Sequence, residues 1–309
     1  MLAQTLVRIR QHRWASSLAG RVLRVPGIGR AARKLADRVL PKGERVWVQV
    51  KRGLGRGLWL KADPYRELGY LRGVPEAEVQ EMMQQYLRPG GCFFDVGSHI
   101  GFYALIGARL VGEYGHVVAF EPEPDNFTLL EENVRRNGFS QVVTLPVAVW
   151  RESGRVPFRR GESGGPRSST RRGAVLSGER CGDQGQNLEV EAFALDDYTQ
   201  RGRAPDFIKV DVEGGEKSVI DGARRLLEEV KPAFLVEVHH ESAAEFLTRR
   251  FTQKGYELRW LPTLYEAPYP RHLLARPCKS PTKSGREIYP RQGCEPQATP
   301  AVGGVDQGL

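Results

Sequence analysis

Closely spaced cysteine pairs and long apolar runs are both missing from this sequence of 309 residues. The four cysteines show no CxxC or CxxH spacing and are scattered at Cys92, Cys181, Cys278 and Cys294. This usage argues against a disulfide framework or a zinc site and is typical of a reducing compartment. No stretch approaches the roughly 20 apolar residues that span a bilayer. Because Arg8, Arg10 and Arg13 interrupt the first apolar residues, a secretory signal is not expected either, and we predict a cytoplasmic protein.

Acidic residues are nearly absent from the first 40 residues, which hold nine basic side chains and one acid, Asp37. Removing these from the totals of 46 basic and 37 acidic residues leaves 37 and 36, so the rest of the chain is close to neutral. An enzyme that acts on nucleic acid places positive charge around its active site, because phosphate contacts dominate its affinity. We therefore expect no nucleic-acid partner for the main domain.

The positive charge is confined to a basic arm, residues 1–44, in which apolar residues such as Leu2, Leu6 and Ile9 stand between the arginines. This pattern predicts short amphipathic helices. Three interpretations remain open. The arm could be an extension packed on the domain, a peripheral contact of residues 1–40 with an anionic membrane surface, or an arginine-rich transit peptide.

Two later segments lack hydrophobic periodicity. Residues 151–187 are rich in glycine, serine and arginine and contain few apolar residues, so we predict a long loop there. Residues 277–309 are rich in proline, glycine and glutamine, which predicts a disordered tail. The predicted globular domain therefore covers residues 45–276.

Within that domain, strand-like and helical patterns alternate. A small hairpin is predicted from residues 45–50 and 58–60, followed by an amphipathic helix around residues 79–87. From Cys92 onward, through the domain core at residues 92–276, short apolar strands are separated by helices. These strands are expected at residues 92–96, 116–120, 142–149, 207–210, 233–238, 256–261 and 272–275. Repeated strand–helix units of this kind predict an α/β fold with a parallel sheet covered on both faces.

The run FFDVGSHIGFY, residues 93–103, ends an apolar strand in an acid, passes two glycines four residues apart and opens a helix. Glycines allow a tight turn and the close approach of a ligand, and such loops at the carboxyl end of a first strand bind adenosine-containing cofactors. The spacing is not GxGxxG, which argues against a dinucleotide. The aspartate before the first glycine suits a cofactor that carries a cationic amino acid and no phosphate.

Glu121 ends the second strand of this core, in the sequence VVAFEP. Rossmann-like proteins place an acid at this point against the hydroxyl groups of a ribose. A carboxylate can accept hydrogen bonds from both hydroxyls of the diol. Glu121 is therefore a candidate ribose ligand.

Together with three later blocks, these motifs resemble the FkbM family of S-adenosylmethionine-dependent methyltransferases. The resemblance runs through residues 94–101, 120–122, 195–198, 208–216 (IKVDVEGGE) and 220–223. It covers about residues 68–276 and implies an α/β class I methyltransferase Rossmann-like fold. Such a fold has a mostly parallel seven-stranded sheet with helices on both faces and holds S-adenosylmethionine over the carboxyl ends of the first strands.

The resemblance also implies the cofactor contacts. The loop residues facing the methionine part would be Asp95, Gly97, Ser98 and Gly101, with Glu121 on the ribose. Ala148, after the third strand, falls where the family approaches the adenine. The chain departs from the family pattern directly after it, because Trp150 and Arg151 replace small or acidic residues.

Four further residues are candidates for the chemistry: Asp211 and Glu213 after the fourth strand, and Glu237 and His239 at the end of the fifth. Methyl transfer needs a positioned acceptor and a group that takes its proton, so we predict that these residues form a base or substrate clamp. Two other interpretations stay open. The residues could form a structural network that caps the next helix, or Asp211, Glu237 and His239 could bind a divalent metal ion. The predicted site itself includes no metal.

The predicted activity is O-methylation of a sugar, glycan or polyketide-like small molecule, with the atom assigned through the family resemblance. One alternative is an inactive methyltransferase fold that serves as a binding or scaffold protein. The intact Asp95, Glu121 and Asp211 favour the enzyme. The other alternative is an RNA or protein methyltransferase, which the near-neutral main domain and the absence of an Asn/Asp-Pro-Pro-Tyr motif disfavour.

Overall fold

Most of the predicted domain is described in the computed structural model of the chain. The described residues are 45–63, 68–73, 76–160, 174–175, 187–200, 202–262 and 270–278. The basic arm and the tail from residue 279 lie outside the described residues, so the predictions for them stay predictions. In the part of the chain that is described, no helix has both the length and the apolar character needed to cross a membrane.

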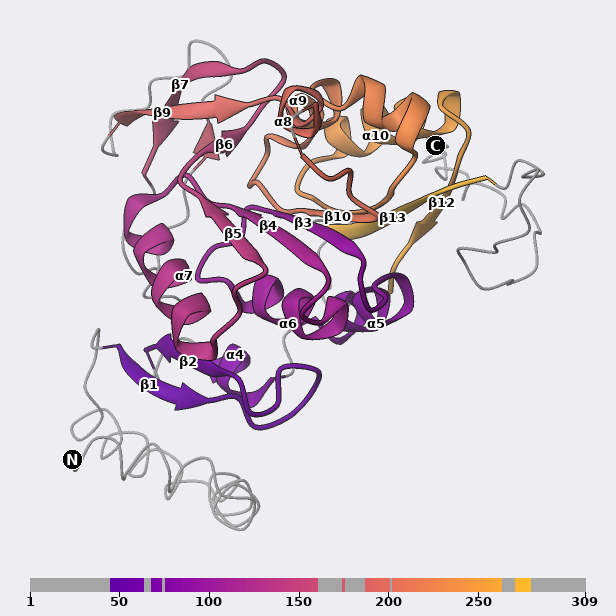
Figure 1. Cartoon of the computed structure of the whole chain (residues 1–309). Coiled ribbons are helices and arrows are strands. Elements are labelled where there is room, and N and C mark those ends of the chain that lie inside the picture. The colour runs from indigo at the N-terminus through magenta and orange to yellow at the C-terminus, as the bar shows by residue number, and fades with distance from the viewer. Residues whose placement is uncertain are drawn as a thin grey trace, which may run out of the picture. The chain divides into compact units, whose positions relative to one another are not determined.

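A seven-stranded sheet forms the centre of the fold (Figure 1). Its strands, in spatial order, are β12 (Tyr256–Trp260), β13 (Arg271–Pro277), β11 (Ala233–Val238), β10 (Phe207–Val210), β3 (Cys92–Val96), β4 (His116–Phe120) and β5 (Val142–Leu145). The strands from β11 to β5 are parallel, and β13 runs antiparallel to both of its neighbours. The predicted fold class, a mostly parallel seven-stranded α/β sheet, is confirmed.

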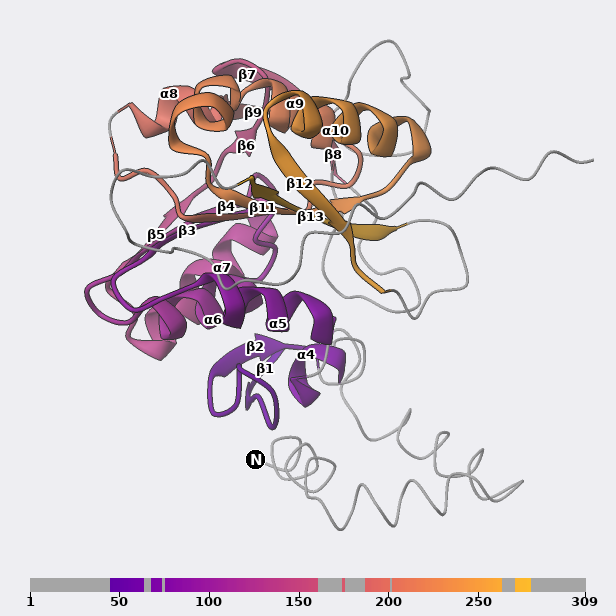
Figure 2. The ribbon, with the colours of Figure 1, turned by 90° about the vertical axis from the view of Figure 1, so that its right-hand side faces the viewer.

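Helices cover both faces of this sheet. One face carries α5 (Ala77–Tyr86), α6 (Phe102–Val111) and α7 (Pro124–Asn137), and the opposite face carries α8 (Leu195–Thr199), α9 (Glu216–Asp221) and α10 (Glu241–Gln253) (Figures 1 and 2). After β10, the helical segment is divided into α9 and a π-helical turn at Leu226–Val230. The structure therefore has three layers, as repeated strand–helix units dictate.

Alternation along the strands gives the two faces of the sheet different compositions. Toward α9 and α10, the strands present mainly apolar side chains such as Phe94, Ile208 and Val236, which belong to one buried cluster with these helices. On the other face, the rings of Phe93 and Phe207 stack, and Phe207 also stacks on Tyr86 of α5. Nearer the carboxyl edge, this second face becomes polar, and the candidate site lies there.

The predicted hairpin is confirmed as β1 (Val46–Gln49) paired antiparallel with β2 (Trp59–Ala62). A short helix, α4 (Leu68–Arg72), follows it. Two asparagines of α7 hold the hairpin, since Asn137 Oδ1 accepts from the Trp59 backbone N–H at 2.8 Å and Asn133 Oδ1 accepts from the Lys61 backbone N–H at 2.7 Å.

The predicted loop at residues 151–187 is wrong in its described part, because it contributes strands to a second sheet. This four-stranded sheet has the order β6 (Ala148–Val149), β9 (Asn187–Phe193), β7 (Gly154–Arg159) and β8 (Ala174–Val175). In β7, Val156 and Phe158 are buried while their neighbours are not, which is the period-two pattern of a strand with one buried face.

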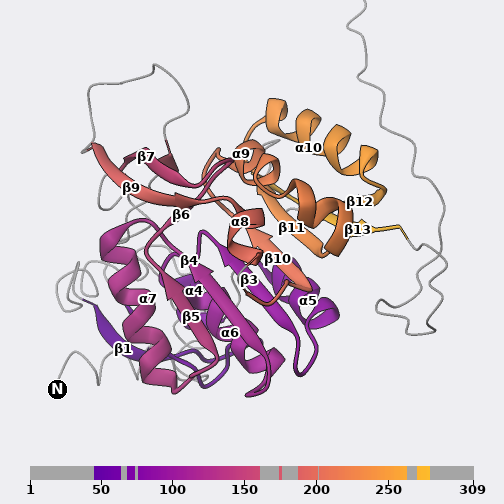
Figure 3. The ribbon, with the colours of Figure 1, turned by 45° about the horizontal axis from the view of Figure 1, so that its top comes forward.

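The same sheet explains a second correction. The single strand predicted at residues 142–149 is divided, with β5 in the central sheet and β6 in the small one. Pro146 falls between them and cannot donate a ladder hydrogen bond. The small sheet lies beside α8 and α9 (Figure 3), and its own core contains Ala148, Trp150 and Phe158.

Candidate functional site

The predicted site residues gather at the carboxyl edge of the central strands, on the face that carries α5 and α6. In the register of the sheet, Asp95 of β3 lies directly opposite Lys209 of β10. Glu237 of β11 lies opposite His272 of β13, because β13 enters the sheet antiparallel at this edge. Polar side chains from four adjacent strands therefore share one face near the ends of the strands.

The two glycines of the loop after β3 are required by the packing of the protein itself. Gly97 has a φ of 81°, and a Cβ atom there would lie 1.8 Å from the backbone oxygen of Asp211. Gly101 has a φ of 88°, and its Cβ would lie 2.6 Å from Leu130 Cδ1. Any other residue would be strained at both positions, and at Gly97 it would push apart the ends of β3 and β10.

Ser98 fixes the same loop from inside. Its hydroxyl donates to the backbone oxygen of Asp95 at 2.7 Å, and its backbone N–H donates to the Phe120 oxygen at 3.0 Å. The Ser98 side chain is thus engaged with the loop that it belongs to. A direct contact of this hydroxyl with a cofactor stays a prediction.

Glu121 is buried at the end of β4 and is tied to the glycine loop. Its Oε2 accepts from the backbone N–H of His99 at 2.7 Å, and its Oε1 accepts from that of Glu123 at 3.0 Å. Burial nevertheless raises the pKa of Glu121 to about 7. The Asn126 amide also donates to Oε1, at 3.4 Å. A carboxylate offers about four acceptor positions, so Glu121 keeps capacity for one further hydrogen bond, such as that from a ribose hydroxyl.

The predicted adenine contact, Ala148, lies in β6 and is buried in the core of the small sheet. That sheet is linked to the cofactor region by Arg160, which follows β7 and forms ion pairs with Glu123 and, at 2.9 Å, with Asp125. Glu123 in turn donates its backbone N–H to Glu121. The small sheet is therefore linked, through Arg160 and Glu123, to the carboxylate expected to hold the ribose.

At the centre of the edge, the ammonium of Lys209 is only 2% exposed. Its Nζ lies 3.2 Å from Asp211 Oδ2, 4.0 Å from Asp95 Oδ1 and 5.0 Å from the centre of the Tyr103 ring. Burial alone would lower the pKa of Lys209, but the charges of Asp211 and Asp95 raise it above its usual value. The sequence motif contained Lys209, yet no role was predicted for it. A lysine inside an apolar strand was the available signal.

Asp95 and Asp211 differ in ionisation although they share this ammonium. Burial raises the pKa of Asp95 to about 6, against the opposing charge of Lys209. Burial would also raise that of Asp211, but Lys209 and a hydrogen bond from Glu237 hold its pKa below the usual range. Burial and the charge of Asp211 raise the pKa of Glu237, so Glu237 is the member of this pair that keeps its proton.

One ring nitrogen of His239 is held by a carboxylate, and the other makes no hydrogen bond within the described residues. Its Nδ1 lies 2.6 Å from Glu216 Oε1, and its Nε2 lies 3.4 Å from Glu213 Oε2. Nε2 is buried and has no hydrogen-bond partner in the described chain. Burial would lower the pKa of His239, but the hydrogen bond with Glu216 and the charge of Glu213 raise it above its ordinary value.

The structure brings all four predicted catalytic residues together. Ligand atoms of Asp211, Glu237 and His239 lie within 4.8 Å of one another, and Glu213 faces His239 from a turn with a φ of 51°. Sequence reasoning missed Glu216, although it lies in the quoted block, at the start of α9. Its carboxylate is fully buried, and it also accepts from the Gly214 backbone N–H at 2.9 Å.

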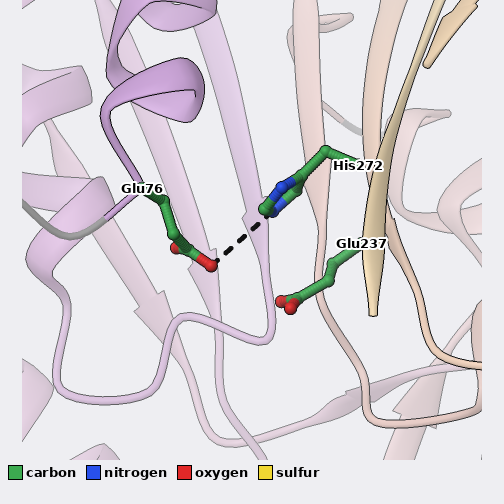
Figure 4. A group of neighbouring side chains, drawn as sticks. All are labelled: Glu76, Glu237 and His272. Atoms are coloured by element: carbon green, nitrogen blue, oxygen red, sulfur yellow. Dashed lines mark ion pairs between the residues drawn. The ribbon is translucent and has the colours of Figure 1, made fainter. Parts of the chain in front are cut away.

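Three further residues of the site were also missed: Glu76, Tyr103 and His272. Glu76 precedes α5, and its Oε2 accepts from the Tyr103 hydroxyl at 2.5 Å. His272 faces Glu76 and Glu237 from β13 (Figure 4). These residues come from parts of the chain far apart in sequence, so no local pattern connected them.

A family model and a curated protein are similar to this chain. The family model described as the methyltransferase FkbM domain matches residues 95–258. Hexuronic acid methyltransferase AglP of Haloferax volcanii is 29% identical to the chain over 171 residues, which cover 55% of this chain and 64% of that protein. The chain therefore spans less than two thirds of the length of this curated relative.

Two solved structures are also similar to this chain. The FkbM methyltransferase of Methylobacillus flagellatus is 20% identical, with a TM-score of 0.44, over 69% of this chain and 58% of that one. An S-adenosylmethionine-dependent O-methyltransferase of Thermotoga maritima is 12% identical, with a TM-score of 0.40, over 78% of this chain and 96% of that one. The assignment of the fold rests on the strand order of the sheet.

The buried carboxylate of Glu121 predicts how cofactor affinity depends on pH. Because Glu121 loses its proton as pH rises through about 7, and the ionised form accepts hydrogen bonds from a ribose diol more strongly, affinity for S-adenosylhomocysteine should rise between pH 6.5 and 8. Glu121→Gln should weaken binding at pH 8 by about 1.5–3 kcal/mol and remove most of this dependence. Isothermal titration calorimetry measures both.

The matched control is Asp125→Asn, which removes an exposed carboxylate near the same helix start. This variant should keep the pH dependence of the wild type. If Glu121→Gln bound the cofactor product as the wild type does at pH 8, Glu121 would not be part of the site.

Proposed function

The chain belongs to the FkbM methyltransferase family, and we propose that it transfers the methyl group of S-adenosylmethionine to a hydroxyl group of a sugar or glycan. The observation that carries this proposal is the position of His239. Its Nε2, which has no hydrogen-bond partner in the described residues, lies among Asp211, Glu213 and Glu237. Asp211 and Glu213 follow β10, the neighbour of β3, and Glu237 lies near the end of β11, the next strand along. The glycine loop after β3 is the proposed cofactor loop.

In the proposed reaction, an acceptor oxygen attacks the methyl carbon as the carbon–sulfur bond breaks, and S-adenosylhomocysteine leaves. The hydroxyl proton must pass to a base within hydrogen-bond reach. His239 fits this role because Glu216 takes the hydrogen bond of Nδ1 and so directs the lone pair of Nε2 to the acceptor. The ring is then oriented as in other carboxylate–histidine pairs.

Asp211 serves a different purpose in this proposal. Its low pKa makes it a weak base, so it acts as a fixed acceptor of a hydrogen bond that orients the substrate. The protonated carboxyl group of Glu237 donates a hydrogen bond to Asp211 and holds that carboxylate in place. Positioning of this kind supplies much of the rate in a displacement reaction.

The choice of a sugar over a polyketide-like metabolite rests on the relative from Haloferax volcanii, which is named a hexuronic acid methyltransferase. A hexuronic acid combines adjacent hydroxyls with a carboxylate. We therefore propose a uronic acid, free or within a glycan, as the acceptor class. A small-molecule or glycan acceptor also agrees with the near-neutral charge of the chain outside the basic arm.

The acceptor class can be tested with the purified full chain and S-adenosylmethionine labelled in its methyl group. We expect label to enter sugars or oligosaccharides that contain a uronic acid, and not matched neutral sugars such as glucose. The measurement is mass spectrometry of the methylated products. Normal binding of S-adenosylhomocysteine without methylation of any sugar would instead support the inactive, scaffold alternative.

The role of His239 predicts a pH profile. Because His239 must be neutral to accept a proton and its pKa lies above the ordinary histidine value, kcat/KM should rise with pH through an apparent pKa that is higher than that of a free histidine. Removing the charge of Glu216 lowers that pKa, so Glu216→Gln should move the rise of kcat/KM to lower pH. His239→Gln should reduce kcat by roughly 10²–10⁴.

The matched control is His240→Gln, since His240 is the next residue and precedes α10. This variant should leave the pH at which kcat/KM rises unchanged. If the rise of kcat/KM moved in His240→Gln but not in Glu216→Gln, His239 would not be the base.

For the basic arm, we propose peripheral contact with anionic membranes, because nine of the 46 basic residues and only one acid lie in residues 1–40. Vesicles that contain phosphatidylserine should bind the full chain, and binding should weaken with salt, as screening of charge requires. A chain that lacks residues 1–44 should lose this binding and keep its affinity for S-adenosylhomocysteine. Equal vesicle binding by both chains in a sedimentation assay would contradict the proposal.

A further inference from the structure

We propose that Glu76, Glu237 and His272 form a binding site for one divalent metal ion of the manganese type. The three side chains come from the start of α5, the end of β11 and the start of β13 (Figure 4). One ligand atom from each lies within 4.8 Å of the other two. Glu237 is the only member that belongs to the four residues predicted for catalysis.

The backbone fixes the three residues in this arrangement. Glu237 and His272 are register partners in antiparallel strands, so their side chains emerge side by side on the same face. Glu76 has a φ of 43°, an unusual conformation for a residue other than glycine, and the Tyr103 hydroxyl binds its Oε2. Its Oε1 is thereby left facing His272, with 3.7 Å between Oε1 and Nε2.

His272 gives an independent indication of a ligand. It is only 6% exposed, and its Nε2 is buried without a hydrogen-bond partner in the described part of the chain. Buried polar atoms are normally bonded, because an unmade hydrogen bond costs about 1–3 kcal/mol. The nitrogen points toward the two carboxylates, where a bound ion would give all three groups a partner (Figure 4).

The acidic side chains at this edge also outnumber the cations. Four carboxyl groups, those of Asp95, Asp211, Glu76 and Glu237, surround the single ammonium of Lys209. Lys209 forms its ion pairs with the two aspartates. Neither Glu76 nor Glu237 has an ion pair with a lysine or arginine among the described residues. A dication that displaces the proton of Glu237 would therefore be balanced by these two carboxylates.

The donor set indicates the class of ion. Two carboxylate oxygens and one imidazole nitrogen suit Mn²⁺, Fe²⁺ or Zn²⁺. Ligands bound at about 2.1 Å lie roughly 3.0–3.4 Å apart at cis-octahedral or tetrahedral angles, so side-chain shifts of about 1–2 Å would close the group around an ion. Three protein ligands leave further positions open, and on the proposed function these would hold oxygens of the sugar acceptor.

The neighbouring group of Asp211, Glu237 and His239 is a poorer site for a dication. Asp211 already pairs with the Lys209 ammonium at 3.2 Å, so a second cation on that carboxylate would be repelled. His239 has Glu216 on Nδ1 and is engaged in the proposed proton transfer. The two groups share Glu237, and the experiment must therefore separate the two histidines.

The test is a titration of the full chain with MnCl₂, without cofactor or acceptor, in which electron paramagnetic resonance measures free Mn²⁺. We expect one ion per chain. His272→Gln and Glu76→Gln should each weaken binding at least tenfold, as ligand loss does. The matched control, His116→Gln, removes a histidine at the opposite end of a strand in the same sheet and should bind as the wild type does.

Thermal melting separates loss of a ligand from loss of folding. The folded wild type should gain thermal stability with Mn²⁺, and both site variants should melt normally without the ion but lose this gain. No binding by the folded wild type, or loss of binding in His239→Gln but not in His272→Gln, would overturn the site. Methyl transfer without Mn²⁺ binding would refute the metal site and leave the proposed function intact. Mn²⁺ binding without transfer to any sugar would support the metal site and contradict the proposed function.

Discussion

The buried ammonium of Lys209 is the constraint on which this edge of the protein depends. A charge that is almost fully removed from water must be paired, and removing one partner of a buried pair typically costs about 3–5 kcal/mol. Asp95 from β3 and Asp211 after β10 supply the pairing, at 4.0 and 3.2 Å. The interaction therefore joins two adjacent strands at the point where their carboxyl ends define the site. The Gly97 loop, packed directly on the Asp211 backbone, follows from this junction.

One cation among several acids also determines how each acid ionises. Asp211, the nearest, stays ionised, while Asp95 and Glu237 are pushed toward their protonated forms by burial. Three similar carboxyl groups thus ionise in two different ways. His239 takes its orientation from a different group, the carboxylate of Glu216. A separate base and a fixed acceptor can then coexist within a few ångströms.

The sequence was sufficient for the features that local patterns encode. Strand–helix alternation predicted the central sheet, and the acids that end β4 and β11 could be placed because the carboxyl ends of parallel strands share one edge. Glu76 and His272 could not be predicted in this way. Their meeting depends on β13 entering the sheet antiparallel beside β11 and on α5 packing near that edge, and neither arrangement leaves a local signal.

The small sheet shows a different limit of sequence reasoning. Its strand β7 places buried Val156 and Phe158 among arginines, so average composition resembled a loop while the alternation was that of a strand. The sheet is part of the support of the site at two points. Arg160 pairs with Glu123, whose backbone binds Glu121.

At the second point, Trp150 packs so closely on the segment around α9 that a Cβ on Gly222 would lie 2.2 Å from the Trp150 backbone oxygen. The same tryptophan ring lies 3.1 Å from the position of a Cβ on Gly215, next to Glu216. The small sheet therefore contacts Glu123, whose backbone binds the carboxylate proposed to hold the ribose, and also the start of the helix that orients His239. A change in its packing would reach the cofactor end and the proton-accepting end of the site together, although it contributes none of the proposed reacting groups.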